Sequence, residues 1–180
     1  MAILVNRYHF SEPVTLNAVA KMANGASFFV IGSVGSKGFY GVVKSDGVVQ
    51  WGRTIAVAGR TVGMMNLVPA SNGDFLLYGF YKIENNRLRH LLFRVDPSGN
   101  VLWRHEIHTP NSRLPSRLVV NSDVKPGKGI YPFTLVGWYN KTGLIDTFEF
   151  RHLNESGEFL QQAQSIGDIH ALADNQITTG

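Results

Sequence analysis

The sequence contains no cysteine among its 180 residues. Disulfide bonds and thiolate metal sites are therefore excluded, and the composition is consistent with a reducing compartment. No run approaches the ~20 apolar residues of a membrane span. The apolar run after Met1 ends at Asn6-Arg7, whereas a secretory signal needs a longer apolar segment behind a basic start. We therefore predict a protein that is cytoplasmic or assembled into a particle.

A strong charge of either sign is also missing. Lysine and arginine total 17 against 13 aspartates and glutamates, which gives a formal net charge of +4. The basic residues are spread along the chain, with loose groups only at 87–90 and 113–117. Because nucleic-acid binders concentrate basic residues on one face or stripe, no nucleic-acid partner is expected.

Common catalytic and metal motifs are absent as well. There is no Gly-x-Ser-x-Gly elbow and no glycine-rich phosphate loop between a strand and a helix. The cluster His105-Glu106-Ile107-His108 falls on a predicted strand, where residues three apart point in opposite directions, so the two histidines cannot share one metal. Glu106 and His108 do share a face.

The carboxylates do not form a recognisable site either. Asp46, Asp96 and Glu155 lie in or beside turns, and turn chemistry explains them without calcium. Asp146, Glu149, Glu155 and Glu158 are scattered along a strand and a turn, whereas acid/base catalysis needs paired carboxylates in a cleft. We therefore predict no catalytic residues, no metal, no cofactor and no enzymatic activity.

What the sequence does contain is an internal repeat. Three copies share a short apolar run that ends in glycine, a loop, a second strand, a glycine turn and a further strand. The first glycine of each copy is Gly32, Gly79 or Gly137, and the second is Gly47, Gly99 or Gly157. Trp51, Trp103 and Gln161 each fall four residues after the second glycine.

Each part of the repeat predicts a β element. The apolar runs 28–31, 75–78 and 133–136 are rich in aromatic and β-branched residues, which is typical of strands buried on both faces. Asp96-Pro-Ser-Gly99 is a strong type I turn signal. An upstream segment completes each copy, and in two copies it ends in Asn-Gly, which favours a hairpin. Each copy therefore predicts a four-stranded antiparallel meander.

This pattern resembles the degenerate β-propeller repeats of bacterial surface and quinoprotein-like proteins, over about residues 14–166. The resemblance implies an all-β fold of tandem blades in a single domain, residues 1–180. We expect full blades at about 14–55, 62–107 and 116–166, and a partial blade built from 1–10 with 167–180. A competing interpretation places amphipathic helices at 11–24 and 166–173.

The function is predicted from this architecture. The first hypothesis is a non-enzymatic structural or interaction protein, a subunit of a virion or a bacterial surface apparatus, that self-associates or binds protein partners through its incomplete terminal blade. The second is a carbohydrate-binding propeller that uses Trp51, Trp103 and Trp138, although recurrence at one repeat position also indicates packing between blades. The third is an enzyme with a site at the mouth of the ring.

Overall fold

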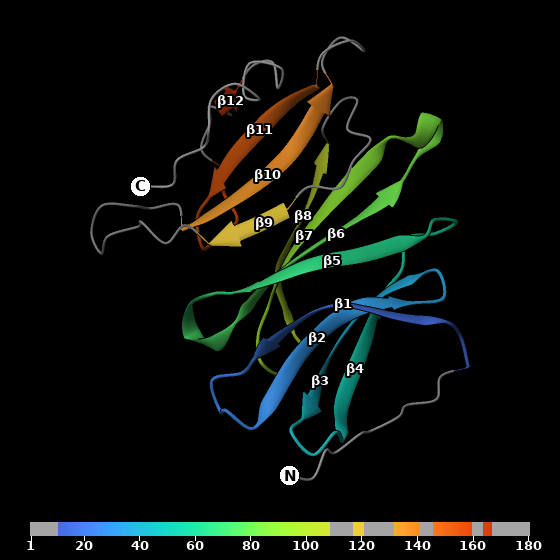
Figure 1. Cartoon of the computed structure of the whole chain (residues 1–180), viewed down its shortest axis with the longest axis vertical. Helices are drawn as coiled ribbons and strands as arrows, with labels where there is room; N and C mark the ends of the chain where they lie inside the picture. The colour runs from blue at the N-terminus through green and yellow to red at the C-terminus, as the bar shows by residue number, and fades with distance from the viewer. Residues whose placement is uncertain (1–10, 109–116, 121–131, 141–145, 160–163, 167–180) are drawn as a thin grey trace, which may run out of the picture.

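The computed structural model describes residues 11–108, 117–120, 132–140, 146–159 and 164–166. These residues form three four-stranded antiparallel sheets, each a meander in chain order (Figure 1). The first sheet consists of β1 (Val14–Lys21), β2 (Ser27–Val34), β3 (Lys37–Lys44) and β4 (Val49–Ile55). The second consists of β5 (Val62–Pro69), β6 (Phe75–Lys82), β7 (Leu88–Val95) and β8 (Val101–His108). The third consists of β9 (Arg117–Val120), β10 (Phe133–Asn140), β11 (Asp146–Leu153) and β12 (Gln164–Ile166).

The predicted all-β class and the propeller-like meanders are confirmed. Residues 14–21 form a strand rather than a helix. Alternate side chains of this strand, among them Ala18 and Ala20, pack against the core between the first and second sheets. Of the second helix alternative, 166–173, only Ile166 lies within the described residues, where it ends β12. The predicted partial blade, 1–10 with 167–180, lies outside them. No helix in the described part of the chain has the length and apolar character needed to cross a membrane.

The second sheet is buried on both sides, between the first and third sheets (Figure 1). Strand alternation explains how it serves two cores, because successive side chains point to opposite faces. Phe75, Leu77 and Phe93 join the core with the first sheet, whereas Leu76 and Leu92 join the core with the third. The continuous apolar run 75–78 is therefore a strand that contacts a neighbouring sheet on each face.

The first glycine of the repeat allows two strands to approach closely. β1 carries a bulge opposite Gly32, and β5 carries one opposite Gly79. A Cβ at Gly79 would lie 2.6 Å from Met64 Sδ and 2.8 Å from the Gly63 carbonyl oxygen, and one at Gly32 would overlap the Thr15 carbonyl. Gly32 and Gly79 thus make room for the bulged strand beside each of them.

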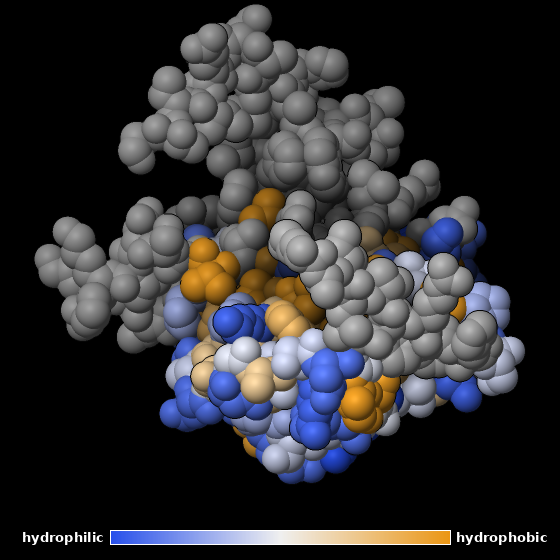
Figure 2. All heavy atoms as spheres, turned by 60° about the horizontal axis from the view of Figure 1, so that its bottom comes forward, coloured by the Kyte–Doolittle hydropathy of each residue, from blue (hydrophilic) through white to orange (hydrophobic). Residues whose placement is uncertain are grey.

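At the exposed end of the first sheet, the described surface is mainly hydrophilic, with apolar side chains in separated patches (Figure 2). Val19 and Val49 are among the large apolar residues that remain exposed on this sheet. The predicted docking through a terminal blade depends on residues 1–10 and 167–180 and stays a prediction.

A buried histidine lies in the core between the second and third sheets. His90 is fully buried, and its Nδ1 lies 2.7 Å from the Tyr78 hydroxyl oxygen. Burial, with a smaller effect from Arg151, lowers the pKa of His90 to about 4 from an ordinary value near 6.5. The folded state therefore holds the imidazole neutral at pH values where the unfolded chain binds a proton.

We expect His90 to make the protein acid-sensitive. Between pH 6.5 and 4 the unfolded state binds one more proton at this site, so stability falls as the pH falls through this window. A shift of this size corresponds to about 3 kcal/mol. Urea denaturation of the wild type and His90→Gln at pH 7 and pH 4 measures it. The variant should lose clearly less stability between the two pH values, and equal losses would contradict the assignment.

Candidate functional site

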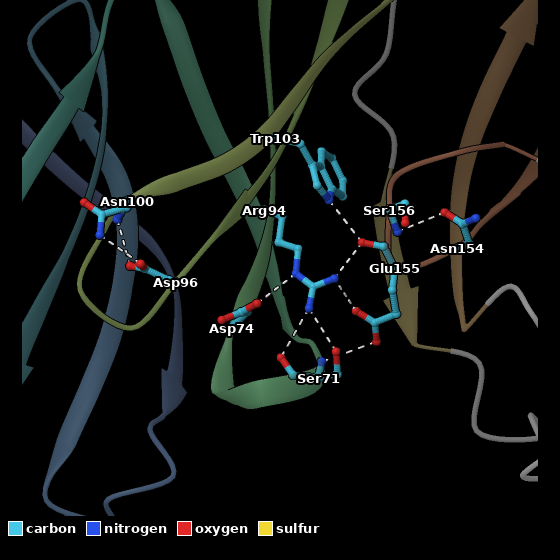
Figure 3. A network of polar contacts seen from close by, with 9 residues as sticks. All are labelled: Ser71, Asp74, Arg94, Asp96, Asn100, Trp103, Asn154, Glu155 and Ser156. Carbon is cyan, nitrogen blue, oxygen red and sulfur yellow. Dashed lines mark hydrogen bonds and ion pairs between the residues drawn. The ribbon is translucent and has the colours of Figure 1, made fainter.

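The second glycine of the repeat lies in a hairpin whose shape is fixed by one polar residue. Asp96 accepts hydrogen bonds at Oδ1 from the amides of Ser98 (2.9 Å) and Asn100 (2.8 Å), and its carbonyl accepts from Gly99 N. Figure 3 shows the contacts between Asp96 and Asn100. Burial opposes ionisation, but these hydrogen bonds together hold the pKa of Asp96 below its ordinary value. The turn predicted at 96–99 is confirmed.

The corresponding hairpin of the third sheet uses asparagine in the same role. Asn154 Oδ1 accepts from the amides of Ser156 (3.0 Å) and Glu158 (2.9 Å), and Glu158 Oε2 accepts from Asn154 Nδ2 (2.8 Å). Glu158, which the sequence offered as a possible catalytic carboxylate, is therefore part of a turn. The side chains of Asp146 and Glu149 are not among those that the structure describes.

The tip of each hairpin lies on the tryptophan of the preceding sheet. A Cβ at Gly99 would lie 2.7 Å from Trp51 Cη2, and one at Gly157 would lie 2.9 Å from Trp103 Cη2. Both glycines have positive φ, 86° and 82°. Trp103 Nε1 also donates to the Glu155 carbonyl oxygen at 3.0 Å. We call these two contacts the hairpin clamps, because each joins one sheet to the next.

Of the three tryptophans predicted to contact a ligand, the structure places two in the clamps. Trp51 packs edge-on against Phe29 and Tyr40, and Arg53 lies over its ring at 5.8 Å. Trp138 belongs to β10, and its side chain lies outside the described ones. The ligand-binding role of the tryptophans stays a prediction.

The second clamp contains an ion-pair network that the sequence did not reveal. Arg94, only 8% exposed, donates from Nε to Asp74 Oδ2 (2.9 Å), from Nη1 to the Glu155 carbonyl (2.6 Å) and from Nη2 to Ser71 Oγ (2.9 Å) (Figure 3). Arg94 Nη1 also lies 2.8 Å from Glu155 Oε2. Glu155 thus joins the second and third sheets.

An open cleft lies between the first and second sheets, at the interface that the first clamp closes. It has a volume of about 310 Å³ and is lined by residues 55–57, by Leu91 and Phe93, and by residues 104–106. A neighbouring hollow of about 560 Å³ shares Phe93 and Arg104 with it. Because the cleft opens between the end of β4 with the residues after it and strands β7 and β8, we call it the rim cleft.

Glu106 lines the rim cleft and has both a hydrogen-bond partner and an ion-pair partner. Its Oε1 accepts a 2.6 Å hydrogen bond from the Tyr81 hydroxyl and lies 3.7 Å from Arg89 Nε. Burial, together with the hydrogen bond and charge of Glu106, raises the pKa of Tyr81, so the phenol keeps its proton and donates. Both contacts are made to Oε1, which leaves Oε2 with acceptor capacity for a ligand.

Strand register brings this cluster together. β7 pairs Arg89 with Tyr81 of β6 on one side, and Leu91 with Glu106 of β8 on the other. From the sequence, Glu106 was considered only as a metal ligand beside His108, and Tyr81 and Arg89 were missed. Aligning the predicted meander strand by strand is the signal that would have placed all three on one face. Among the described residues, no group of three His, Cys, Asp or Glu side chains is arranged to hold a metal.

The described fold is that of a β-propeller-like protein, and comparisons with known proteins agree. No protein-family model and no curated protein matches the chain. Among solved structures, it is similar to a periplasmic gluconolactonase from Pseudomonas aeruginosa, with a TM-score of 0.51 and 16% identity over 85% of this chain and 40% of that one. It is also similar to a eukaryotic initiation factor, with a TM-score of 0.54 and 13% identity over 92% of this chain and 35% of that one. The chain spans less than half the length of either, and such identities show the fold alone.

These similarities correct the predicted function. The prediction of a non-enzymatic structural subunit of a virion or surface apparatus rested on the absence of catalytic motifs, and that inference was wrong. A catalytic protein, the gluconolactonase, shares this fold at low sequence identity, so missing motifs in a propeller-like chain do not exclude catalysis. The gluconolactonase is also periplasmic, so the fold does not favour the predicted cytoplasmic location.

Proposed function

We propose that the chain binds a small polyhydroxylated ring, a sugar or a sugar lactone, in the rim cleft. The observation that carries the proposal is Glu106, fixed by Tyr81 beside an apolar wall of Leu91 and Phe93. A sugar ring has a polar edge of hydroxyl groups and an apolar face of C–H groups. The rim cleft offers a partner for each.

The electrostatics and the size of the cleft support the same ligand class. A carboxylate held in one orientation accepts hydrogen bonds from ring hydroxyls at little cost in side-chain entropy. The volume of about 310 Å³ is at the lower end of the ~300–1,000 Å³ typical of ligand pockets, which suits one ring better than a long chain.

Lactones are included in the ligand class to be tested, because one of the similar solved structures is a gluconolactonase. A carboxylate such as Glu106 is also a group that accepts a proton from an attacking water. As part of this proposal, the repeats are of the type found in bacterial surface and quinoprotein-like propeller proteins.

The proposal predicts that Glu106→Gln weakens ring binding about tenfold, because the amide loses the charge-assisted hydrogen bonds. Saturation-transfer NMR with monosaccharides and glucono-lactone measures binding, and acid release above the spontaneous rate measures lactone hydrolysis. Glu158→Gln makes the same change at an exposed residue after β11, outside the cleft, and is the control that should leave both readouts unchanged. Absence of ring binding by the wild type, or equal binding by Glu106→Gln, would refute the proposal.

A further inference from the structure

We propose that the ring recognised in the rim cleft carries a carboxylate, as uronic and aldonic acids do. This inference rests on the proposed function and specifies its ligand. The inference is based on the charges around the cleft, where basic residues outnumber acidic ones. Glu106 is the acidic residue of the cleft wall, and Arg104 lies two residues before it on the same strand and the same wall.

Further cations lie close by. Arg89 contacts Glu106, and Arg60 is near enough to Tyr81 to act on its hydroxyl. An adjoining hollow of about 410 Å³ is lined by Arg60 and Lys37 and shares residues 56 and 57 with the cleft. A single carboxylate cannot neutralise this group, so the local field favours an anion.

An unsatisfied donor points the same way. Arg89 Nη1 is buried and has no hydrogen-bond partner among the described residues. A buried charged donor without an acceptor destabilises the folded state. Arg89 Nε lies 3.7 Å from Glu106 Oε1, so the positive charge of Arg89 lies beside the carboxylate of the cleft. A ligand carboxylate bound at Arg104, which lines the cleft, would offset this local excess of positive charge, and the planar guanidinium matches it better than an ammonium would.

The apolar wall decides between an acidic sugar and a simple anion. Leu91 and Phe93 offer nothing to inorganic phosphate or sulfate, whereas the C–H face of a sugar ring buries against them. The arginines and the apolar wall together therefore select an anionic ring.

NMR titration of the wild type with glucuronate and with glucuronamide tests this inference, because the two ligands differ only in the charged group. We expect glucuronate to bind about tenfold more tightly at low salt, and the difference to shrink as ionic strength rises. Arg104→Gln should bring the two affinities to within about twofold, because it removes one cation from the wall. Lys21→Gln, which removes an exposed charge on β1, should keep the full preference.

The outcomes separate the two proposals. Equal binding of glucuronate and glucuronamide would overturn the carboxylate inference and leave ring binding in place. Tighter binding of glucose 6-phosphate than of glucuronate would also overturn it, in favour of phosphate recognition. If none of these rings binds, the proposed function itself fails.

Discussion

Replacing Arg94 by methionine is expected to remove about 3–5 kcal/mol from the free energy of unfolding. Arg94 bonds Asp74 and Ser71 of its own sheet and the Glu155 carbonyl of the next. The arginine and aspartate side chains of this pair are only 10% and 8% exposed. Loss of the guanidinium therefore leaves Asp74 buried without its counter-charge. Chemical denaturation followed by tryptophan fluorescence measures the change.

The first clamp provides a matched control for Arg94. Arg53 donates to the Ser98 carbonyl and to Asn100 Oδ1 at 3.3 and 3.4 Å, and all three groups are exposed. Arg53→Met should therefore cost less than about 1 kcal/mol. Adding Asp74→Leu to Arg94→Met should recover part of the lost stability, because it removes the stranded charge. Equal costs for Arg94→Met and Arg53→Met would contradict the role of the network.

Replacing Gly99 by alanine is expected to cost about 2–5 kcal/mol. Roughly 1–2 kcal/mol comes from the left-handed backbone, since φ is 86°. A further ~1–3 kcal/mol comes from overpacking, because the new Cβ would meet the Trp51 ring at 2.7 Å. Trp51 cannot easily move away, since Phe29 and Tyr40 pack against it. Thermal and urea denaturation give the value.

Gly59 separates the two contributions. It also has positive φ, 66°, but a Cβ there would have no heavy atom within 4 Å. Gly59→Ala should therefore show only the backbone cost, about 1–2 kcal/mol. Combining Gly99→Ala with Trp51→Leu should cost less than the sum of the two single changes, because the smaller side chain relieves the overlap. Strict additivity would show that the hairpin does not press on the ring.

Much of the fold was predictable because the repeat imposes local chemistry that does not depend on the rest of the chain. Asp96-Pro-Ser-Gly99 closes a turn through its own side chain, and the apolar runs before Gly32 and Gly79 form strands buried on both faces. The reason for the first glycine was not predictable. It depends on a bulge in the neighbouring strand, which no local pattern marks.

The candidate site was largely missed. Tyr81, Arg89 and Glu106 come from three strands and meet only once the strand register is known. Arg94 was equally hidden, because its equivalent in the first copy is Val42, so the repeat alignment gave no reason to expect a charge there. Trp51 and Trp103 were identified because they occupy the same position of the repeat. Their equivalent contacts in the two hairpin clamps follow from that shared position. Residues that occur in only one copy, such as Glu106, escape a search based on repetition.

The central claim is that the second glycine of the second and third copies places a hairpin against the tryptophan of the preceding sheet, and that the Gly99 contact builds the interface that holds the rim cleft. Glycine-selective isotope labelling with nuclear Overhauser spectroscopy observes this contact in solution. The account predicts cross-peaks from the Gly99 α-protons to the Trp51 indole and from those of Gly157 to Trp103, with ring-current shifts upfield. Unshifted glycine resonances without indole cross-peaks would contradict it.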